Sequence, residues 1–261
     1  MSAIRLGTRA STLATTQSEM VAGLLRSEGL DVNLTTITTH GDTSTASLAA
    51  MGGIGVFASA IRAALLEGEA DIAVHSFKDL PTGRPLGLAI GAVPARADPR
   101  DALVARDGLT LHDLPQEASV GTGSPRRAAQ LLAVRPDLTI VDIRGNVDTR
   151  LGRVKGLGRY AKNGGKEDLD AVVLAASGLA RLGHSGAVTE FLDPSVVLPA
   201  PAQGALAVEC RTADSRHGKL AKALARIDDR RTRLAATAER AVLSHLEAGC
   251  AAPIGALAQL K

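Results

Sequence analysis

Three stretches of the chain repeat one plan: a β-branched apolar run, a tight polar turn and the start of a helix, with arginine in or just after the turn. They are residues 118–127 (ASVGTGSPRR), 138–150 (LTIVDIRGNVDTR) and 171–182 (AVVLAASGLARL). A fourth apolar run, residues 70–81 (ADIAVHSFKDLP), ends in Lys78 and Asp79. Open α/β sheets collect such loop residues at the carboxyl ends of their strands. The pattern predicts four cationic strand ends in one open sheet system, and a site for a small polyanion with one carboxylate available for chemistry.

The composition of the 261 residues indicates what fills the interior and which ligands are favoured. Apolar residues make up 45% of the chain but aromatic residues only 2%, with no Trp, so the core must be built from Ala, Val, Leu and Ile. The formal charge of +3 is compatible with a nucleic-acid partner. Single-stranded bases need aromatic stacking platforms, however, and the chain has one Tyr and three Phe. The composition therefore favours a small anionic ligand over a nucleic acid.

Targeting signals and cysteine spacing narrow the class of protein further. The N-terminus has no apolar stretch of signal-peptide length, and no window reaches the ~18 apolar residues of a membrane span, so we expect a cytoplasmic protein. Cys210 and Cys250 show no metal-binding spacing and are too few for a disulfide framework. Cys210 lies in an apolar run and is expected in the core. Cys250 follows Gly249 among small residues, where a thiol is either accessible and reactive or an inert loop cysteine.

The N-terminal region is predicted to be one α/β domain with an anion site at its first helix. Ser11 stands at the N-cap position of that helix, so it and Arg9 lie at a helix N-terminus, where anions bind readily. The remaining expected elements of this domain are strands at 4–6, 32–39 and 72–74, a helix at 57–66 and a mobile Gly/Ser/Thr-rich loop at 41–55.

Two proline-bounded crossings predict a second lobe. Residues 94–99 (PARADP) lead into the βα series with the three arginine-bearing turns, and residues 198–204 (LPAPAQG) lead out of it to an apolar strand at 205–210. A chain that crosses twice between two lobes is expected to form a hinged, two-lobed architecture. A helix should follow from about Asp229, stopped by Gly249.

The turn GTGSPRR combines several features of an anion-binding helix start. Ser124 can cap the helix, Pro125 suits its first position, and Arg126 and Arg127 follow. Arginine is unfavourable at the positive end of a helix unless an anion is present. The alternative is a capped surface helix with two solvated arginines.

The other two turns place further guanidinium groups near the same ligand. Arg144 and Arg150 bracket a turn, and their forks match carboxylates in a bidentate way. The alternative for this pair is a surface salt bridge to Asp142 or Asp148. Arg181 ends the third repeat, and its alternative is a solvated helix face.

Asp79 is the carboxylate that stands among these cations. It follows Lys78 on a turn, and a carboxylate held near cations stays ionised, which suits it to stabilise a cationic intermediate or a pyrrole-type N–H. The alternative is an Asp that merely caps the turn. His75, in the apolar strand before it, is expected to be a core histidine rather than a base.

Nine stretches of the sequence resemble the porphobilinogen deaminase family, also called hydroxymethylbilane synthases. They are IRLGTRAS, GDT, ADIAVHSFKDLP, DPRDAL, VGTGSPRRAAQL, RGNVDTRL, AASGLARLG, LPAPAQGALAVECR and TAERAVLSHLEAGCAAPIGA, which occur in family order between Ile4 and Ala256. The resemblance implies a monomeric cytosolic transferase of tetrapyrrole (porphyrin and haem) biosynthesis. Such an enzyme joins four porphobilinogen molecules head to tail, releases ammonia at each step and hydrolyses the chain to hydroxymethylbilane. It also implies a dipyrromethane cofactor attached by a thioether, here to Cys250.

The resemblance further implies roles for individual side chains. Asp79 would be the catalytic carboxylate, and no metal would be needed. The residues that would bind the cofactor, besides Cys250, are Lys78, Thr122, Ser124, Arg126, Arg127, Arg144 and Gln203. The residues that would bind the substrate and the growing chain are Arg9, Ser11, Arg150 and Arg181.

The family fold implied is α/β: two periplasmic-binding-protein-like (type 2) lobes joined by a hinge, plus a small C-terminal α/β domain. The expected ranges are 1–95 with 205–222 for the first lobe, 100–200 for the second and 223–261 for the third domain. Because the chain ends at Lys261, we expect this third domain to be incomplete, with a lone strand after Ala252 that lacks sheet partners.

Three alternatives to an active family enzyme remain open from the sequence. A non-catalytic two-lobed protein that binds a small polycarboxylate would share the lobes and the arginines but have no reason for Asp79 and Cys250. A nucleic-acid binder is favoured only by the basic loop at residues 152–166, which contains no acid. An inactive, truncated family member is the third alternative.

Overall fold

The computed structural model describes residues 3–37, 56–83, 85–248 and 252–260. The chain divides into two compact units. The first comprises Met1–Ala97, Ala205–Ala251 and Ala258–Lys261, and the second comprises Asp98–Gly204 and Ala252–Leu257. Among the described residues, no helix has both the length and the apolar character needed to cross a membrane.

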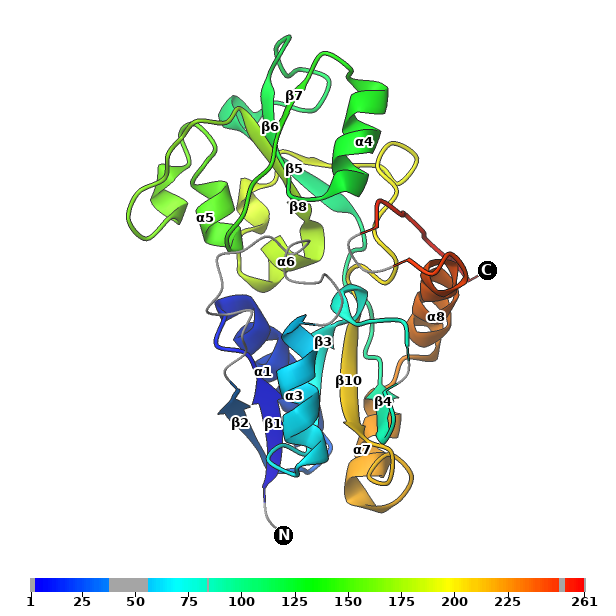
Figure 1. Cartoon of the computed structure of the whole chain (residues 1–261). Helices are drawn as coiled ribbons and strands as arrows, with labels where there is room; N and C mark the ends of the chain where they lie inside the picture. Colours follow the sequence, from blue (N-terminus) through cyan, green and yellow to red (C-terminus); the bar gives the residue numbers. More distant parts are fainter. Residues whose placement is uncertain (1–2, 38–55, 84, 249–251, 261) are drawn as a thin grey trace. The chain divides into compact units, whose positions relative to one another are not determined.

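The first unit is built on a five-stranded sheet with the order β2-β1-β3-β10-β4 (Figure 1). Its strands are β1 (Ile4–Thr8), β2 (Val32–Thr36), β3 (Ile72–Ser76), β4 (Leu88–Ala92) and β10 (Leu206–Arg211). β1 is parallel to β2 and β3, whereas β10 is antiparallel to both β3 and β4. The helices of this unit are α1 (Thr12–Ser27), α3 (Val56–Leu66), α7 (Gly218–Ile227) and α8 (Arg230–His245).

Alternation of side chains along β3 gives this sheet two apolar faces. Ile72 and Val74 pack in one cluster with Val21 and Leu25 of α1 and Leu224 of α7. Ala73, which lies between them in the sequence, packs in a second cluster with residues of α3. Because successive side chains of a strand point to opposite faces, an all-apolar run such as IAV is buried on both sides. The strand expected at 72–74 is thus confirmed.

The second unit has a five-stranded sheet with the order β7-β6-β8-β5-β9. Figure 1 labels β5, β6, β7 and β8 of this sheet. Its strands are β5 (Asp101–Ala105), β6 (Ser119–Gly121), β7 (Thr139–Val141), β8 (Ala171–Ala175) and β9 (Glu190–Phe191). Its helices are α4 (Pro125–Val134), α5 (Val147–Leu151) and α6 (Ala176–Arg181). The three repeats expected from the sequence are therefore real strand–turn–helix units: β6 with α4, β7 with α5 and β8 with α6.

The two sheets share one topology. In each, a strand that follows a crossing inserts antiparallel beside the third strand of a parallel trio: β10 beside β3, and β5 beside β8. The expectation of two α/β lobes is confirmed. The expectation of four strand ends in one sheet system is wrong, because Asp79 follows a strand of the first sheet and the three arginine-bearing turns belong to the second.

The C-terminal region differs from its prediction in detail. Asp229 caps α8 by accepting a hydrogen bond from the Thr232 N–H at 2.7 Å, as expected, but the helix ends at His245, before Gly249. The strand expected after Ala252 is not formed in residues 252–260. That segment is held instead by isolated hydrogen bonds, among them the one from the Ala256 N–H to the Pro199 carbonyl at 3.0 Å. The loop expected at 41–55 lies outside the described residues.

Candidate functional site

The predicted site residues of the first unit follow two neighbouring parallel strands. β1 and β3 are paired in parallel, so their carboxyl ends lie at the same edge of the sheet. Arg9 and Ser11 follow β1, and Lys78 and Asp79 follow β3. Ser11 caps α1 as expected, because its Oγ accepts a hydrogen bond from the backbone of α1 at 3.4 Å. The topology therefore brings these four residues to one edge.

Asp79 ends a single 3₁₀ turn, η1 (Phe77–Asp79), directly after β3. Its side chain is exposed, and no other described residue pairs with it or donates a hydrogen bond to its carboxylate. Ser76, which precedes the turn, accepts a hydrogen bond on Oγ from Gln17 Nε2 at 3.0 Å. Gln17 is buried, and this contact explains why a polar residue interrupts the apolar stripe of α1. Asp79 thus presents a carboxylate that the described part of the chain leaves available.

In the second unit, the predicted residues again gather at the carboxyl edge of the sheet. β6 is parallel to both β7 and β8, so the segments after these three strands start at the same edge. Thr122 and Ser124 follow β6, Arg144 follows β7, and Arg181 ends the short helix after β8. Ser124 caps α4 and Pro125 occupies its first turn, as expected.

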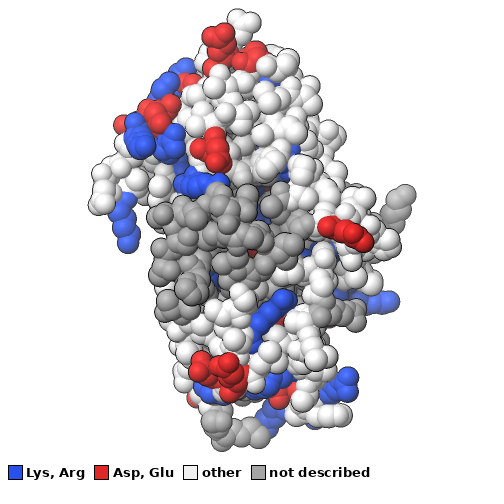
Figure 2. Space-filling model, in the orientation of Figure 1, with Lys and Arg blue, Asp and Glu red and all other residues white. Residues whose placement is uncertain are grey.

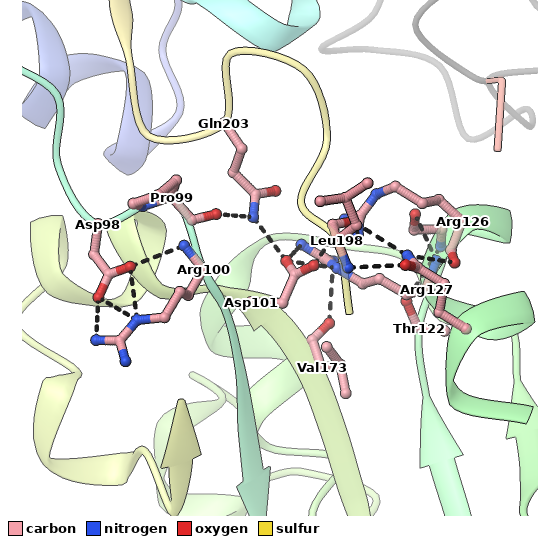
Figure 3. A network of polar contacts seen from close by, with 12 residues as sticks. Asp98, Pro99, Arg100, Asp101, Thr122, Arg126, Arg127, Val173, Leu198 and Gln203 are labelled. Carbon is pink, nitrogen blue, oxygen red and sulfur yellow. Dashed lines mark hydrogen bonds and ion pairs between the residues drawn. The ribbon is translucent and has the colours of Figure 1, made fainter. Parts of the chain in front are cut away.

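Arg126 and Arg127 are buried at the start of α4, with only 4% and 6% of their surface exposed. The alternative of two solvated surface arginines is therefore wrong. Both guanidinium groups pair with one carboxylate, that of Asp101 at the start of β5 (Figure 3). Sequence reasoning missed Asp101 as a site residue. Its signal is an acid that opens the fully buried strand DALVA.

The Asp101 cluster, defined as Asp101, Arg126, Arg127 and Gln203, is densely hydrogen-bonded (Figure 3). Asp101 Oδ1 accepts from Arg127 Nη2 at 2.7 Å and from Gln203 Nε2 at 2.8 Å. Asp101 Oδ2 lies 2.8 Å from Arg126 Nη2. Gln203 Nε2 also donates to the Pro99 carbonyl at 2.8 Å, so the cluster ties together the two segments at which the chain enters and leaves this unit.

The Asp101 cluster retains a net positive charge. Burial raises the pKa of a carboxyl group, but Arg127 and Arg126 outweigh this effect and hold the pKa of Asp101 below its usual range. Asp101 is therefore ionised, and one negative charge offsets two positive ones. A buried cation that is only partly compensated favours an anion beside it. The cluster is suited to attract a carboxylate to the edge where α4 begins.

Arg150 adds a further cation to this group. Burial lowers the pKa of Arg150, and the like charges of Arg127 and Arg144 lower it further. Its Nε donates to the Gly145 carbonyl at 2.8 Å. Gly145 has φ 101°, in the left-handed region, which is why glycine stands in this turn.

The surface alternative for this turn is present in part. Arg144 is half exposed and lies 3.5 Å from Asp142, so it forms the loose salt bridge that the sequence left open. Asp148 pairs instead with His184, at 2.6 Å, and leaves Arg150 without that partner. A loose, exposed pair costs little to break. Arg144 can therefore exchange Asp142 for a ligand carboxylate.

Arg181 is half-buried rather than solvated, so the alternative of an exposed helix face is wrong. Its Nη2 donates to the Gly204 carbonyl at 2.7 Å, whereas its buried Nε has no hydrogen-bond partner among the described residues. Burial lowers the pKa of Arg181 to about 10. An unsatisfied buried N–H of a cation is costly, and an anionic ligand would satisfy it.

The two remaining chemical candidates of the sequence are core residues. Cys210 is fully buried in β10, and burial raises the pKa of its thiol to about 11. His75 is buried in β3, where its Nε2 lies 3.3 Å from Glu209 Oε2 without the alignment of a hydrogen bond. The expected core positions of both residues are confirmed, but the hydrogen-bonding capacity of the His75 Nε2 is not satisfied by the described residues. Cys250 lies outside the described residues.

Two cations of the basic loop at residues 152–166 are paired with acids that follow the loop. Arg153 forms an ion pair with Asp168, and Lys155 Nζ lies 2.8 Å from Asp170 Oδ1. On the face shown in Figure 2, basic and acidic side chains of the described surface are interspersed. In the described part of the chain, no three His, Cys, Asp or Glu side chains lie together as metal ligands would. These pairings weaken the one feature that favoured a nucleic-acid partner.

Comparisons with known proteins agree with the resemblance. The family model described as "Porphobilinogen deaminase, dipyromethane cofactor binding domain" matches residues 4–219, and the model of the porphobilinogen deaminase C-terminal domain matches residues 233–261. The porphobilinogen deaminase of Micrococcus luteus is 57% identical over 100% of this chain and 74% of its own length. The porphobilinogen deaminase of Leifsonia xyli subsp. xyli is 58% identical over 99% of this chain and 76% of its own length.

A solved structure with lower similarity is a nutrient-binding protein from Burkholderia cenocepacia bound to methionine, at 16% identity and a TM-score of 0.49, covering 85% of this chain and 91% of that one. Both of these relatives are porphobilinogen deaminases, and the matches extend over both units and the C-terminal segment. The alternative of a non-catalytic binding protein is therefore set aside. The chain belongs to the porphobilinogen deaminase family, the dipyrromethane-dependent transferases of tetrapyrrole biosynthesis.

Proposed function

We propose that this chain performs the family reaction with Asp79 as its catalytic carboxylate and Cys250 as the attachment point of its cofactor. The reaction condenses four porphobilinogen molecules with loss of ammonia and yields hydroxymethylbilane. The observation that supports the role of Asp79 is its exposed carboxylate, with which no described residue pairs. This carboxylate lies at a sheet edge that also bears Arg9 and Lys78.

The cationic edge of the second unit fits a ligand that carries several carboxylates. An anion would pair with the Arg181 Nε, which has no hydrogen-bond partner among the described residues, and would offset the net positive charge of the Asp101 cluster. The residues proposed to hold the cofactor are Lys78, Thr122, Ser124, Arg126, Arg127, Arg144 and Gln203. Those proposed to hold the substrate and the growing chain are Arg9, Ser11, Arg150 and Arg181.

The contacts in this unit suggest two ways in which these residues act. Arg126 and Arg127 are bound to Asp101, so they supply a fixed positive field and cannot swing to follow a ligand, and Gln203 helps to hold Asp101 in place. Arg144, by contrast, pairs loosely with Asp142 among the described residues and is placed to make a direct bidentate contact. A site that must accept a lengthening polycarboxylate needs both fixed and adaptable cations.

Asp79 would act by charge. When bound, the dipyrromethane supplies the pyrrole carbon to which the first new unit is joined. The Asp79 carboxylate would accept a hydrogen bond from a pyrrole N–H and stabilise the positive charge that develops as ammonia leaves the substrate. A fixed carboxylate performs this role without being reorganised at the moment of reaction.

The finer assignments belong to the same proposal. We expect the protein to act in the cytoplasm as a monomer, with porphobilinogen as its substrate. The lobe boundaries at 1–95, 205–222 and 100–200, and the partial third domain at 223–261, also stay predictions. Direct detection of ammonia and hydroxymethylbilane from porphobilinogen tests the activity of the chain.

Replacing Arg150 with Lys tests the cationic edge. An ammonium cannot reproduce the guanidinium fork, so Arg150→Lys should lower kcat/KM for porphobilinogen by about tenfold or more, which is about 1.4 kcal/mol of lost transition-state stabilisation. Arg153→Lys is the matched control, because Arg153 lies in the same unit but pairs with Asp168. Steady-state kinetics that fail to separate the two variants would remove Arg150 from the site.

A further inference from the structure

The turn that bears Asp79 has little internal support. η1 is closed by one long backbone bond, from the Leu80 N–H to the Phe77 carbonyl at 3.4 Å. Ser76, at its N-cap position, makes no side-chain cap bond. A three-residue 3₁₀ turn of this kind has poor hydrogen-bond geometry of its own. The conformation of this turn therefore depends on groups outside it.

Arg240, near the middle of α8, supplies such groups. Its Nη1 donates to the Phe77 and Leu80 carbonyls at 2.8 Å each, and its Nη2 donates to the Pro81 carbonyl at 2.7 Å. These three carbonyls lie on both sides of Asp79 in the sequence. The guanidinium also stacks on the Phe77 ring, 4.5 Å from its centroid. The Arg240 side chain thus binds the backbone on both sides of Asp79.

Burial makes this contact strong and specific. Arg240 is only 9% exposed, and a buried guanidinium is stable only where acceptors satisfy its N–H groups. The planar fork can donate to several carbonyls at once while stacking on an aromatic ring, which an ammonium cannot do. The sequence alone could not reveal the contact, because Arg240 and Leu80 are far apart along the chain.

The helix that carries Arg240 is itself anchored by the preceding residue. Glu239 forms a bidentate ion pair with Arg96, at 2.6 and 2.9 Å, and its Oε1 also accepts from the Ala258 N–H at 2.9 Å. α8 is therefore held to the segment that follows β4, through Arg96, and to the C-terminal segment of the same unit, through Ala258. Arg240 reaches the Asp79 turn from a fixed base, and the chain beyond α8 leads to Cys250.

We propose that Arg240 is a positioning residue for the reaction: it holds the Phe77–Pro81 backbone so that the Asp79 carboxylate is presented in one orientation. The proposal rests on the proposed role of Asp79. It assigns Arg240 no contact with substrate or cofactor. Replacing Arg240 should therefore lower the rate of the chemical step and make the turn more mobile, with little effect on substrate affinity.

The experiment compares Arg240→Gln and Arg240→Lys with Arg135→Gln in the full chain. Arg135 is a matched control, because it also donates to backbone carbonyls, those of Leu111 and Leu114 at 2.8 and 3.0 Å, but in a loop of the second unit that precedes β6. Amide hydrogen exchange of residues 76–83, kcat, KM and the melting temperature are measured for each variant.

We expect Arg240→Gln to speed exchange of residues 76–83 by about tenfold or more, since local opening sets exchange, and to leave KM within about threefold of the parent. Its kcat should fall by about thirtyfold or more, a change in transition-state stabilisation rather than in binding. Arg135→Gln should show neither effect at a similar loss of melting temperature. Arg240→Lys, which keeps the charge and some donors, should recover part of kcat.

A double variant separates this proposal from the proposal for Asp79. If Arg240 acts through Asp79, Arg240→Gln should add almost nothing to the loss caused by Asp79→Asn. Protected amides at 76–83, or a kcat equal to that of Arg135→Gln, would overturn the role of Arg240 even where Asp79→Asn is inactive. Should Arg240→Gln not fold, the same comparison is made with Arg240→Lys. Full activity of Asp79→Asn would instead overturn the role of Asp79.

Discussion

Asp79→Asn should fold like the parent and still bind polycarboxylates, but lose porphobilinogen turnover by about a thousandfold, the scale of removing a preorganised electrostatic group. The substitution keeps the shape of the side chain and deletes its charge. Because Asp79 is exposed and has no partner among the described residues, no internal ion pair is broken and stability should change little. Chemical denaturation and steady-state kinetics on the same sample separate the two effects.

Asp31→Asn is the control for this prediction. Asp31 is also an exposed aspartate of the first unit, but it precedes β2 and so lies at the opposite edge of the sheet from Asp79. The turnover of porphobilinogen by Asp31→Asn should equal that of the parent. Asp79→Asn that keeps turnover within about tenfold of the parent, a difference of only ~1.4 kcal/mol, would mean that the carboxylate is not catalytic.

Asp101→Asn should be the most destabilising single change in the second unit. It removes the one negative charge that compensates two buried guanidinium groups, and breaking a buried pair in this way costs about 3–5 kcal/mol. Urea unfolding at pH 7 measures the loss. Asp107→Asn is the control, because Asp107 pairs with Arg106 but is largely exposed, and exposed pairs contribute about 1 kcal/mol or less.

The loss should depend on pH in a definite direction. The pKa of Asp101 is held below its usual value in the folded protein, so its contribution is fully present above the unfolded pKa of about 3.9 and is lost as pH falls through the folded pKa. The difference between the parent and Asp101→Asn should therefore be constant near neutral pH and narrow below about pH 4. A difference that grows on acidification would contradict the ionised state of Asp101.

The local parts of this fold could be predicted from the sequence, because their signals lie within a few residues. The three strand–turn–helix repeats and the caps at Ser11, Ser124 and Asp229 are of this kind. The two crossings predict two lobes, but the assignment of all four strand ends to one sheet system is wrong, because strand order is set by pairings between distant segments, such as β10 with β3. The residues of a turn do not indicate which distant strands pair with one another.

The types of residue in the site could be predicted from the sequence, but the contacts that these residues make with one another could not. Arg126 and Arg127 at the positive end of a helix need an anion, as the sequence predicts, and that anion is Asp101, which the pairing of β5 with β8 brings beside α4. The contact of Arg240 with the Asp79 turn likewise spans most of the chain. Cys250 could be selected over Cys210 only through the family resemblance and the apolar context of Cys210.

Intact-mass spectrometry of the purified chain tests the central claim most directly. We predict one dipyrromethane adduct on the parent after supply of porphobilinogen, its absence from Cys250→Ser and its retention by Cys210→Ser, since burial raises the pKa of the Cys210 thiol to about 11 and keeps it protonated. A parent that stays unmodified, or an adduct that survives in Cys250→Ser, would contradict the account.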